Sequence, residues 1–427
     1  MLASRVRAAT DAAQGSFLRI EEPVDSCDIM QWLRAVPSGA RRYFRDRGSK
    51  FEIAGDGVAA SVELGAHDAW TQEGAPHCRA AAWFVSLPFD AARVRDAAWS
   101  PFVRHGCVLP EIELRREGDR HTLAVHLVHG ADRERIAARL ERIAEPAEDC
   151  VIEPALVRES DGMAEAEWTR AVRGALGRIR SGSLRKIVLA RARRYAASAR
   201  LDPVGVLARV ASRELRGFRF LVEAGEGRSF VGVTPERLVS RVGRVARSEA
   251  VAGTRPRGVD GVADRLLGES LLASVKDRRE HELVVDRVRE ALASCALSVR
   301  VDAEPRLLRL AYVQHLATRV QADLRSGTSD AELIAALHPT PAVAGAPVGS
   351  AIALLREIEP FDRGLYAGPV GVVSRDGAEI AVAIRSALIE GDRLHAFAGA
   401  GIVDGSDPAE EWRETGHKLL AFERLAT

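Results

Sequence analysis

The sequence predicts an α+β fold in which most strands pair antiparallel. Short runs rich in β-branched and aromatic residues, bounded by Gly, Pro and Asp, recur through the first 155 residues. Near the other end, residues 363–397 contain three apolar runs separated by short turns, as in consecutive antiparallel strands. Between these regions, several stretches repeat apolar residues with helical spacing.

The composition is that of an ordinary globular protein. Of 427 residues, 47% are hydrophobic and 28% are charged, and the formal net charge is +1. This balance gives no overall field to attract nucleic acid or an anionic membrane. We expect no membrane span, which needs about 18 apolar residues, and no signal peptide. The five cysteines form no CxxC pair, which favours a reduced, cytoplasmic protein.

The chain is expected to divide at about residue 155. Residues 1–155 form a β-rich part with one helix at residues 131–143, and this part carries little mechanistic signal. Residues 156–427 contain every candidate for catalysis and binding. A polar stretch that contains two prolines, residues 146–158, marks the expected join.

The C-terminal segment organises the candidate site. Its small-residue run, residues 398–401, would form a loop that lets backbone N–H groups approach a ligand. A helix is expected after Asp407, a favourable N-cap that is followed by proline. Glu411, Glu414 and Lys418 share one face of this helix and could hold a divalent cation and an anionic ligand. The alternative is a solvated face with a Glu414–Lys418 ion pair.

Two other residues are candidates for acid–base chemistry. Lys186 begins a β-branched strand, where burial would disfavour its charged form and let it act as a general base. Glu236 lies in a turn directly after an apolar strand, where burial would raise the pKa of its carboxyl group and let it act as an acid. The alternatives are a strand lysine whose charged end reaches solvent and an exposed turn glutamate.

Residues 265–293 predict one long amphipathic helix whose middle is dense in charge. Glu280 on this helix could supply an oxygen ligand to Mg²⁺, which takes one or two carboxylates together with waters and substrate oxygens. The alternative is a charged solvent face with a Lys276–Glu280 pair. Just before the helix, the turn at Gly253 and Thr254 offers N–H and hydroxyl donors.

Three more candidates lie between this helix and the C-terminal segment. His315 is embedded in a predicted strand. Ala342 belongs to a proline-rich loop, residues 338–347, which cannot be regular structure and is apolar enough to line a cavity. Arg385 is expected within an apolar strand, where a guanidinium is costly to bury unless it meets an anion.

Several of these residues belong to six short motifs. In chain order the motifs are Lys186-Ile-Val-Leu-Ala-Arg, Phe230-Val-Gly-Val-Thr-Pro-Glu-Arg-Leu, Ala252-Gly-Thr-Arg, Leu271-Leu-Ala-Ser-Val-Lys-Asp-Arg-Arg-Glu-His, Tyr366-Ala-Gly-Pro-Val-Gly and the closing segment at residues 397–418. Each motif is weak alone, but six in this order are specific. Together they resemble the chorismate-utilising enzymes, which include isochorismate, salicylate, anthranilate and aminodeoxychorismate synthases.

The resemblance covers residues 165–424 and implies a fold. The expected fold is the chorismate-binding, anthranilate synthase component I-like fold, with two large, mostly antiparallel sheets and helices packed outside. Residues 1–155 would then be a divergent N-terminal part of the same fold, and residues 156–427 the chorismate-binding catalytic region.

The resemblance also implies a Mg²⁺-dependent reaction on chorismate. Glu280 and Glu414 would bind the metal ion, with Glu411 nearby through water, and the metal ion would hold the ring carboxylate. Lys186 would activate water for attack at C2, and Glu236 would protonate the departing C4 hydroxyl.

The remaining implied residues bind the substrate. Those at the enolpyruvyl carboxylate are Tyr366, Arg385, Lys418 and the backbone of Gly399 and Gly401. Gly253 and Thr254 would line the ring pocket, and His315 would stand near the ring carboxylate.

Three positions separate the members of the family. Amine-adding and salicylate-forming relatives tend to carry threonine or serine where Ala342 stands and lysine where Val348 stands, and aminodeoxychorismate synthases often carry lysine where Ala252 stands. The resemblance is therefore to an isochorismate synthase, an isomerase that adds water, of menaquinone or siderophore biosynthesis. The alternatives are a salicylate synthase, which also expels pyruvate, and a chorismate-binding protein without turnover. The family also implies a monomer.

Overall fold

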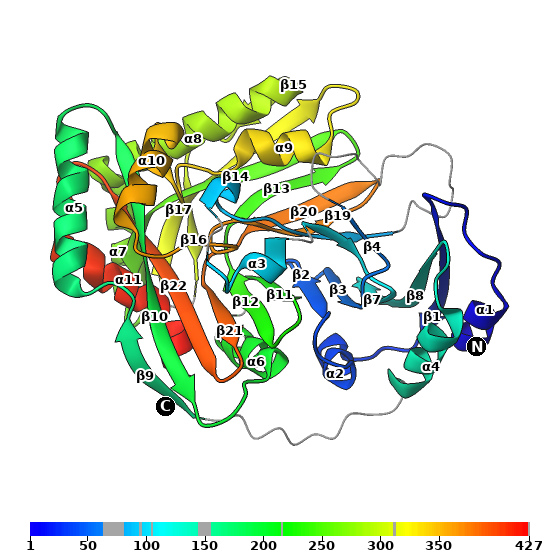
Figure 1. Cartoon of the computed structure of the whole chain (residues 1–427). Coiled ribbons are helices and arrows are strands. Elements are labelled where there is room, and N and C mark those ends of the chain that lie inside the picture. Colours follow the sequence, from blue (N-terminus) through cyan, green and yellow to red (C-terminus); the bar gives the residue numbers. More distant parts are fainter. Residues whose placement is uncertain are drawn as a thin grey trace.

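The computed structural model shows two large sheets with the helices outside them (Figure 1). It describes residues 1–62, 81–93, 96–103, 106–143, 155–214, 217–310 and 313–425. The strand pairings within these ranges are antiparallel, from the β1–β8 pair to the β21–β22 pair. The predicted α+β class and its two-sheet architecture are therefore confirmed. No helix in the described ranges is both long and apolar enough to cross a membrane.

The larger sheet has twelve strands in the order β1-β8-β7-β3-β2-β11-β12-β21-β22-β10-β18, with β9 beside β10. Its strands are β1 Phe17–Val24, β2 Arg42–Arg45, β3 Phe51–Asp56, β7 Ile112–Glu117, β8 Arg120–Val128, β9 Leu156–Asp161, β10 Lys186–Ala197, β11 Phe218–Glu223, β12 Arg228–Thr234, β18 Gly345–Ala346, β21 Ser386–Glu390 and β22 Arg393–Ile402. Strands from the first part of the chain continue the sheet directly, because β2 pairs with β11 from Arg42–Val222 to Arg45–Arg219.

The smaller sheet has ten strands in the order β15-β17-β14-β13-β20-β19-β5-β6-β4, with β16 beside β17. Its strands are β4 Ala60–Val62, β5 Trp83–Ser86, β6 Cys107–Leu109, β13 Arg237–Val242, β14 Val245–Pro256, β15 Ala296–Val301, β16 Arg306–Arg309, β17 Val313–Leu324, β19 Pro369–Val373 and β20 Gly377–Val382. Early and late segments meet here too, because β5 pairs with β19. The stretch at residues 146–158, expected to be the join, lies largely outside the described residues.

Most of the helices lie outside the sheets, whereas the short α3 lies among the residues of the core (Figure 1). They are α1 Leu2–Ala8, α2 Ile29–Ala35, α3 Ser100–Val103, α4 Arg133–Ile143, α5 Glu165–Arg180, α6 Pro203–Arg213, α7 Gly261–Ala273, α8 Val275–Cys295, α9 Asp330–Leu337, α10 Val348–Ile358 and α11 Pro408–Glu423. Helix α8 packs on β14 and β17 of the smaller sheet, and α11 packs on β22 of the larger one. These two helices therefore approach the region between the sheets from different sides.

Local capping decides where these two helices begin. Asp407 caps α11 as predicted, and its carboxylate accepts hydrogen bonds from the backbone N–H groups of Ala409 and Glu410, both at 3.0 Å. The single helix predicted over residues 265–293 is wrong, because the chain breaks into α7 and α8 at Ser274. Ser274 takes an extended conformation and its hydroxyl caps α8, a competition with the helix ladder that an amphipathic pattern does not reveal.

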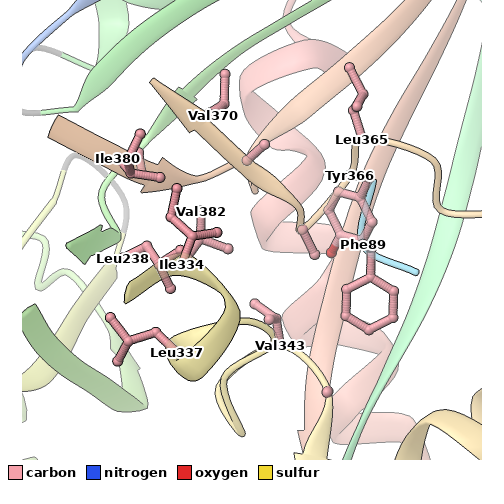
Figure 2. Packing of buried hydrophobic residues seen from close by; sticks show 14 of the residues in the cluster. Phe89, Leu238, Ile334, Leu337, Val343, Leu365, Tyr366, Val370, Ile380 and Val382 are labelled. Atoms are coloured by element: carbon pink, nitrogen blue, oxygen red, sulfur yellow. The ribbon is translucent and has the colours of Figure 1, made fainter. Parts of the chain in front are cut away.

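The two sheets share one apolar core (Figure 2). Figure 2 shows side chains of β13, β19 and β20 beside those of α9 and of the loop before β19, namely Leu238, Val370, Ile380, Val382, Ile334, Leu337, Leu365 and Tyr366. Val343, from the proline-rich loop, lies in the same cluster together with Phe89. The apolar loop is thus packed against the core through Val343.

A buried ion pair fixes this loop. Arg363 and Glu359, whose side chains are 3% and 2% exposed, form hydrogen bonds of 2.5 and 2.9 Å. Arg363 also donates to the backbone carbonyls of Val343 and Val188, each at 2.7 Å. Glu359 Oε1 also accepts a hydrogen bond of 2.9 Å from the backbone N–H of Ala190. The pair therefore joins the loop to strand β10.

We expect Glu359→Ala to lower the free energy of unfolding by about 3–5 kcal/mol, because the substitution leaves Arg363 buried without its counter-charge. Urea unfolding measures this change. The control is Asp286→Ala, which breaks the exposed Asp286–Arg289 pair, with side chains 56% and 55% exposed. That control should cost less than about 1 kcal/mol. Equal losses in the two variants would contradict the structural role of the buried pair.

Candidate active site

A pocket between the two sheets collects the candidate residues. It has about 780 Å³ of empty space and is walled by β10, β14, β17 and β22, the turn after β12, and helices α8 and α11. The candidates that line it are Lys186, Glu236, Gly253, Thr254, Glu280, His315, Ala342, Tyr366, Arg385, Gly399, Gly401, Glu414 and Lys418. The remaining candidate, Glu411, lines an adjoining polar pocket together with Glu280 and Glu414. The fold therefore brings the whole predicted set together.

Lys186 is buried at the start of β10, and its side chain is 2% exposed. Its Nζ donates a hydrogen bond of 2.8 Å to Glu280 Oε1 of α8. This contact replaces the Lys276–Glu280 pair that the sequence left open. A lysine whose charged end reaches solvent is also excluded. The ammonium group thus lies inside the pocket, with a carboxylate as its only hydrogen-bonding partner among the described residues.

Glu236 lies in the turn between β12 and β13 and is 6% exposed. Its backbone carbonyl accepts a hydrogen bond from the N–H of Val382 at 3.0 Å, which anchors the turn to the end of β20. Burial raises the pKa of its carboxyl group to about 7, and the nearby ammonium groups of Lys186 and Lys418 only partly oppose this effect. A carboxyl group with such a pKa can donate a proton near neutral pH.

His315 of β17 is held as a neutral imidazole. Its Nδ1 lies 3.1 Å from the hydroxyl of Thr254 and 3.1 Å from the carbonyl oxygen of Gly253. Burial, followed by the positive charges of Arg385 and Lys418, lowers the pKa of His315 to about 3. Gly253 has φ +73° at an irregularity of the β14–β17 pairing, and an added Cβ would lie 3.2 Å from that of Asp277, so glycine is required there.

Arg385 is buried but does not lie in a strand, so that expectation is wrong. Strand β20 ends before it and β21 begins after it, and Arg385 itself has φ +52°, a strained conformation for a residue other than glycine. Its side chain lines the pocket and makes no hydrogen bond to the described residues. A buried guanidinium without a partner is expected to meet an anionic ligand.

The small-residue run at residues 398–401 was expected to be a loop, and this expectation is also wrong. It forms the end of β22, paired with β10, rather than a loop. A Cβ on Gly401 would lie 3.0 Å from Lys186 Cε and 3.1 Å from Glu280 Oε1. A Cβ on Gly399 would lie 3.1 Å from the hydroxyl of Tyr366. The glycines therefore leave room for these side chains at the pocket wall.

Three carboxylate side chains, Glu280 of α8 and Glu411 and Glu414 of α11, line one polar pocket. Glu414 forms an ion pair of 2.7 Å with Lys418, whose Nζ also donates to the carbonyl of Gly399 at 2.9 Å. The Glu414–Lys418 ion pair of the alternative reading is therefore present, but Glu411 is 8% exposed, so the helix face is not the solvated one that this reading expected. Burial, reinforced by the negative charge of Glu414, raises the pKa of Glu411 to about 7. Carboxylates crowded together in this way are stabilised by a cation.

These carboxylates fit Mg²⁺ by their chemistry. No group of three or more His, Cys, Asp or Glu side chains in the described residues is already arranged around a common point. Mg²⁺ does not need such a cage, because it usually keeps several waters and binds one or two carboxylates together with substrate oxygens. Glu280, Glu411 and Glu414 line the same polar pocket and supply oxygen ligands of the required kind.

Sequence reasoning missed the apolar part of the pocket wall, formed by Val188, Ile384 and Phe397. Val188 follows Lys186 by two positions on β10, so the alternation of strand side chains could have found it. The ring of Phe397 stacks on that of Tyr366, with the ring centroids 5.2 Å apart. No local signal marks Ile384, which lies in the irregular segment before Arg385.

Comparisons with known proteins all point to enzymes that bind chorismate. The sequence profile of a family described as chorismate binding enzymes matches residues 4–425. The isochorismate synthase MenF of Bacillus subtilis is 35% identical over 344 residues, which cover 79% of this chain and 72% of that protein. The salicylate biosynthesis isochorismate synthase of Pseudomonas aeruginosa is 37% identical over 343 residues, or 78% of this chain and 72% of the relative.

Solved structures match over the whole chain. The structure of MenF, the menaquinone-specific isochorismate synthase from Escherichia coli, superposes with a TM-score of 0.88 and 28% identity, and covers 100% of this chain and 99% of that one. Anthranilate synthase component I from Streptococcus pneumoniae shares the fold at 21% identity, with a TM-score of 0.63 over 96% of this chain and 92% of that one.

The pKa of Glu236 predicts a pH-dependent contribution to stability. Because this pKa rises from 4.5 to about 7 on folding, the folded protein keeps a proton that the unfolded chain releases. The stabilisation is fully present below about pH 4.5 and is lost as the pH rises through about 7. Glutamine has no proton to lose. We therefore expect the free energy of unfolding of Glu236→Gln, relative to that of the wild type, to increase by up to about 3 kcal/mol as the pH is raised from about 5 to about 8.

Urea unfolding of the wild type and of Glu236→Gln at about pH 5 and about pH 8 measures this change. Glu357→Gln serves as the control, because Glu357 is exposed on α10, and its difference from the wild type should be the same at both pH values. A difference between Glu236→Gln and the wild type that does not change with pH would contradict a proton held by the buried Glu236.

Proposed function

The chain belongs to the chorismate-binding enzymes, and we propose that Lys186 and Glu236 are the base and the acid with which it isomerises chorismate to isochorismate. The enzyme is an isochorismate synthase. The observation that carries the assignment of roles is that a buried lysine and a buried carboxyl group of raised pKa line the same pocket. One match is described as menaquinone-specific and another as an enzyme of salicylate biosynthesis, so we propose the reaction only as far as isochorismate.

The proposed reaction adds one hydroxyl group and removes another. In its reacting form Lys186 is a neutral amine, and it takes a proton from water as the water oxygen bonds to C2 of chorismate. The electron pairs of the ring shift, the C4–O bond breaks, and Glu236 gives its proton to the departing hydroxyl, which leaves as water. Atoms and charge balance, because the proton lost by Glu236 equals the one gained by Lys186.

Binding of the substrate is proposed to use the other pocket residues. Arg385 is the main anchor of the enolpyruvyl carboxylate, because its guanidinium has no hydrogen-bonding partner in the described residues. Tyr366, Lys418 and the backbone at Gly399 and Gly401 lie beside it in the pocket. Gly253 and Thr254 would line the ring, with His315 near the ring carboxylate. When bound, Mg²⁺ would be held by Glu280 and Glu414, with Glu411 through water, and would supply positive charge to that carboxylate.

Incubation with chorismate tests the reaction directly. We expect isochorismate in equilibrium with chorismate when Mg²⁺ is present, and almost no turnover after chelation, because the ring carboxylate would lose its counter-charge. Chromatography identifies the products, and a lactate dehydrogenase assay detects pyruvate. Salicylate with an equal amount of pyruvate would show a salicylate synthase, and anthranilate in the presence of ammonium would show an amine-adding enzyme.

Substitution of the proposed base and acid tests their roles. We expect Lys186→Ala and Glu236→Gln each to lower kcat by about 10²- to 10⁴-fold, the usual contribution of general acid–base catalysis. Lys50→Ala is the control, because Lys50 is exposed in the turn between β2 and β3 and should keep wild-type kcat. If both variants kept their turnover, other residues would have to supply the base and the acid.

A further inference from the structure

A cluster of arginines surrounds a buried carboxylate behind the pocket. The side chain of Glu249 on β14 is 4% exposed, and its Oε1 accepts hydrogen bonds from Arg47 at 2.8 Å and from Arg306 at 3.0 Å. Arg237 lies 3.8 Å from the same oxygen, but its closer partner is Glu379, at 2.7 Å. These contacts keep Glu249 ionised although it is buried.

Arg47 also holds the turn that carries Glu236. Its second terminal nitrogen donates a hydrogen bond of 3.0 Å to the backbone carbonyl of Pro235, the residue immediately before Glu236. Its guanidinium lies over the ring of Phe218 on β11, 5.5 Å from the centroid. Arg47 comes from the turn between β2 and β3, so a residue of the first part of the chain reaches the back of the pocket.

The position of the Glu236 carboxyl depends on this turn, because the carboxyl makes no hydrogen bond to the described residues. Three backbone contacts hold the turn instead. The N–H of Glu236 donates to the hydroxyl of Thr234 at 3.3 Å, its carbonyl accepts from Val382 at 3.0 Å, and the carbonyl of Pro235 accepts from Arg47. Of these contacts, only the one from Arg47 depends on a side chain remote in the sequence.

Three charged side chains and one hydroxyl group act on the Glu236 carboxyl group. Lys186 of β10 and Lys418 of α11 favour its ionised form, whereas Glu249 of β14 opposes it. The hydroxyl of Tyr366, before β19, also lies close enough to interact with it. Glu249 is thus the charged group of this set that helps Glu236 to keep its proton.

We propose that Arg47 is a positioning residue for the acid: one guanidinium fixes both the Pro235–Glu236 turn and the Glu249 carboxylate behind it. The inference rests on the proposed role of Glu236. It gives the first part of the chain a function in catalysis, because Arg47 sets where the proton donor points and which anion stands behind it. A displacement of the donor by about 1 Å can cost about 10²-fold in rate.

Steady-state kinetics of the full chain with Mg²⁺ and chorismate test this proposal. We expect Arg47→Met to lower kcat by about 10- to 100-fold and to leave KM within about 3-fold, because Glu236 acts on the leaving group rather than on the bound carboxylates. The matched control is Arg306→Met, which removes another arginine from Glu249 without touching the turn. Its kcat should stay within about 3-fold of the wild type. An Arg47 effect no larger than that of Arg306, or one confined to KM, would overturn the proposal.

The pH profile separates positioning from a general loss of structure. Glu249→Gln removes the anion behind the acid, so Glu236 should lose its proton at lower pH, and the alkaline limb of kcat should move down by about 1 pH unit. A limb that does not move would overturn the role of Glu249. If Arg47→Met does not fold, this pH profile and the kcat of Arg47→Lys decide the proposal. A lysine has one terminal nitrogen and is expected to keep only one of the two contacts, that with Glu249 or that with the Pro235 carbonyl.

A double variant distinguishes this proposal from the assignment of the acid. If Glu236→Gln alone keeps wild-type kcat, the proposed function of Glu236 fails, whatever Arg47 does. If Glu236→Gln is impaired, adding Arg47→Met should lower kcat by less than about 3-fold more, because there is no longer an acid to position. A full additional loss in the double variant would show that Arg47 acts elsewhere, and would overturn the positioning role alone.

Discussion

The buried pair of Glu359 and Arg363 is the constraint on which the pocket depends. An ion pair this deeply buried persists only when its remaining donors and acceptors are also satisfied. Here backbone groups provide that satisfaction, since Arg363 binds the carbonyls of Val188 on β10 and of Val343 on the proline-rich loop. The strand that begins with Lys186 and the loop that closes the pocket are therefore held to each other, and neither can shift without exposing a charge.

No single segment forms the active site, and this follows from the topology. Lys186 comes from the larger sheet, His315 comes from the smaller one, and Glu236 lies where the chain passes from one to the other. The two sheets must pack at close range for these groups to meet. Within the larger sheet, Gly401 leaves room for the side chains of Lys186 and of Glu280 from α8. The first part of the chain extends both sheets, so it supports the pocket from behind rather than standing apart from it.

Local patterns predicted the features that local forces decide. The cap at Asp407 and the turn at Glu236 follow from residue types within a few positions, and the structure has both. Features set by distant partners were not predictable. Glu280 pairs with Lys186 across 94 positions, and spacing along a helix suggests only its neighbours. The left-handed conformation of Arg385, between the ends of two strands, has no marker in the local sequence. The break at Ser274 is a local cap, but the apolar pattern that continues past it concealed the break. Spacing along the sequence did not show that these residues form one site. That prediction came from the resemblance to a family.

The charges in the pocket agree with the proposed binding of a ligand with two carboxylates and of a divalent cation. Three cationic side chains line it, and two of them, Lys186 and Lys418, are paired with Glu280 and Glu414. His315 is neutral and Glu236 keeps its proton up to about pH 7, so Arg385 is left as the one unpaired charge in the described part of the pocket. It can balance one carboxylate of chorismate but not both. We propose that a cation held by the carboxylates of α8 and α11 balances the second.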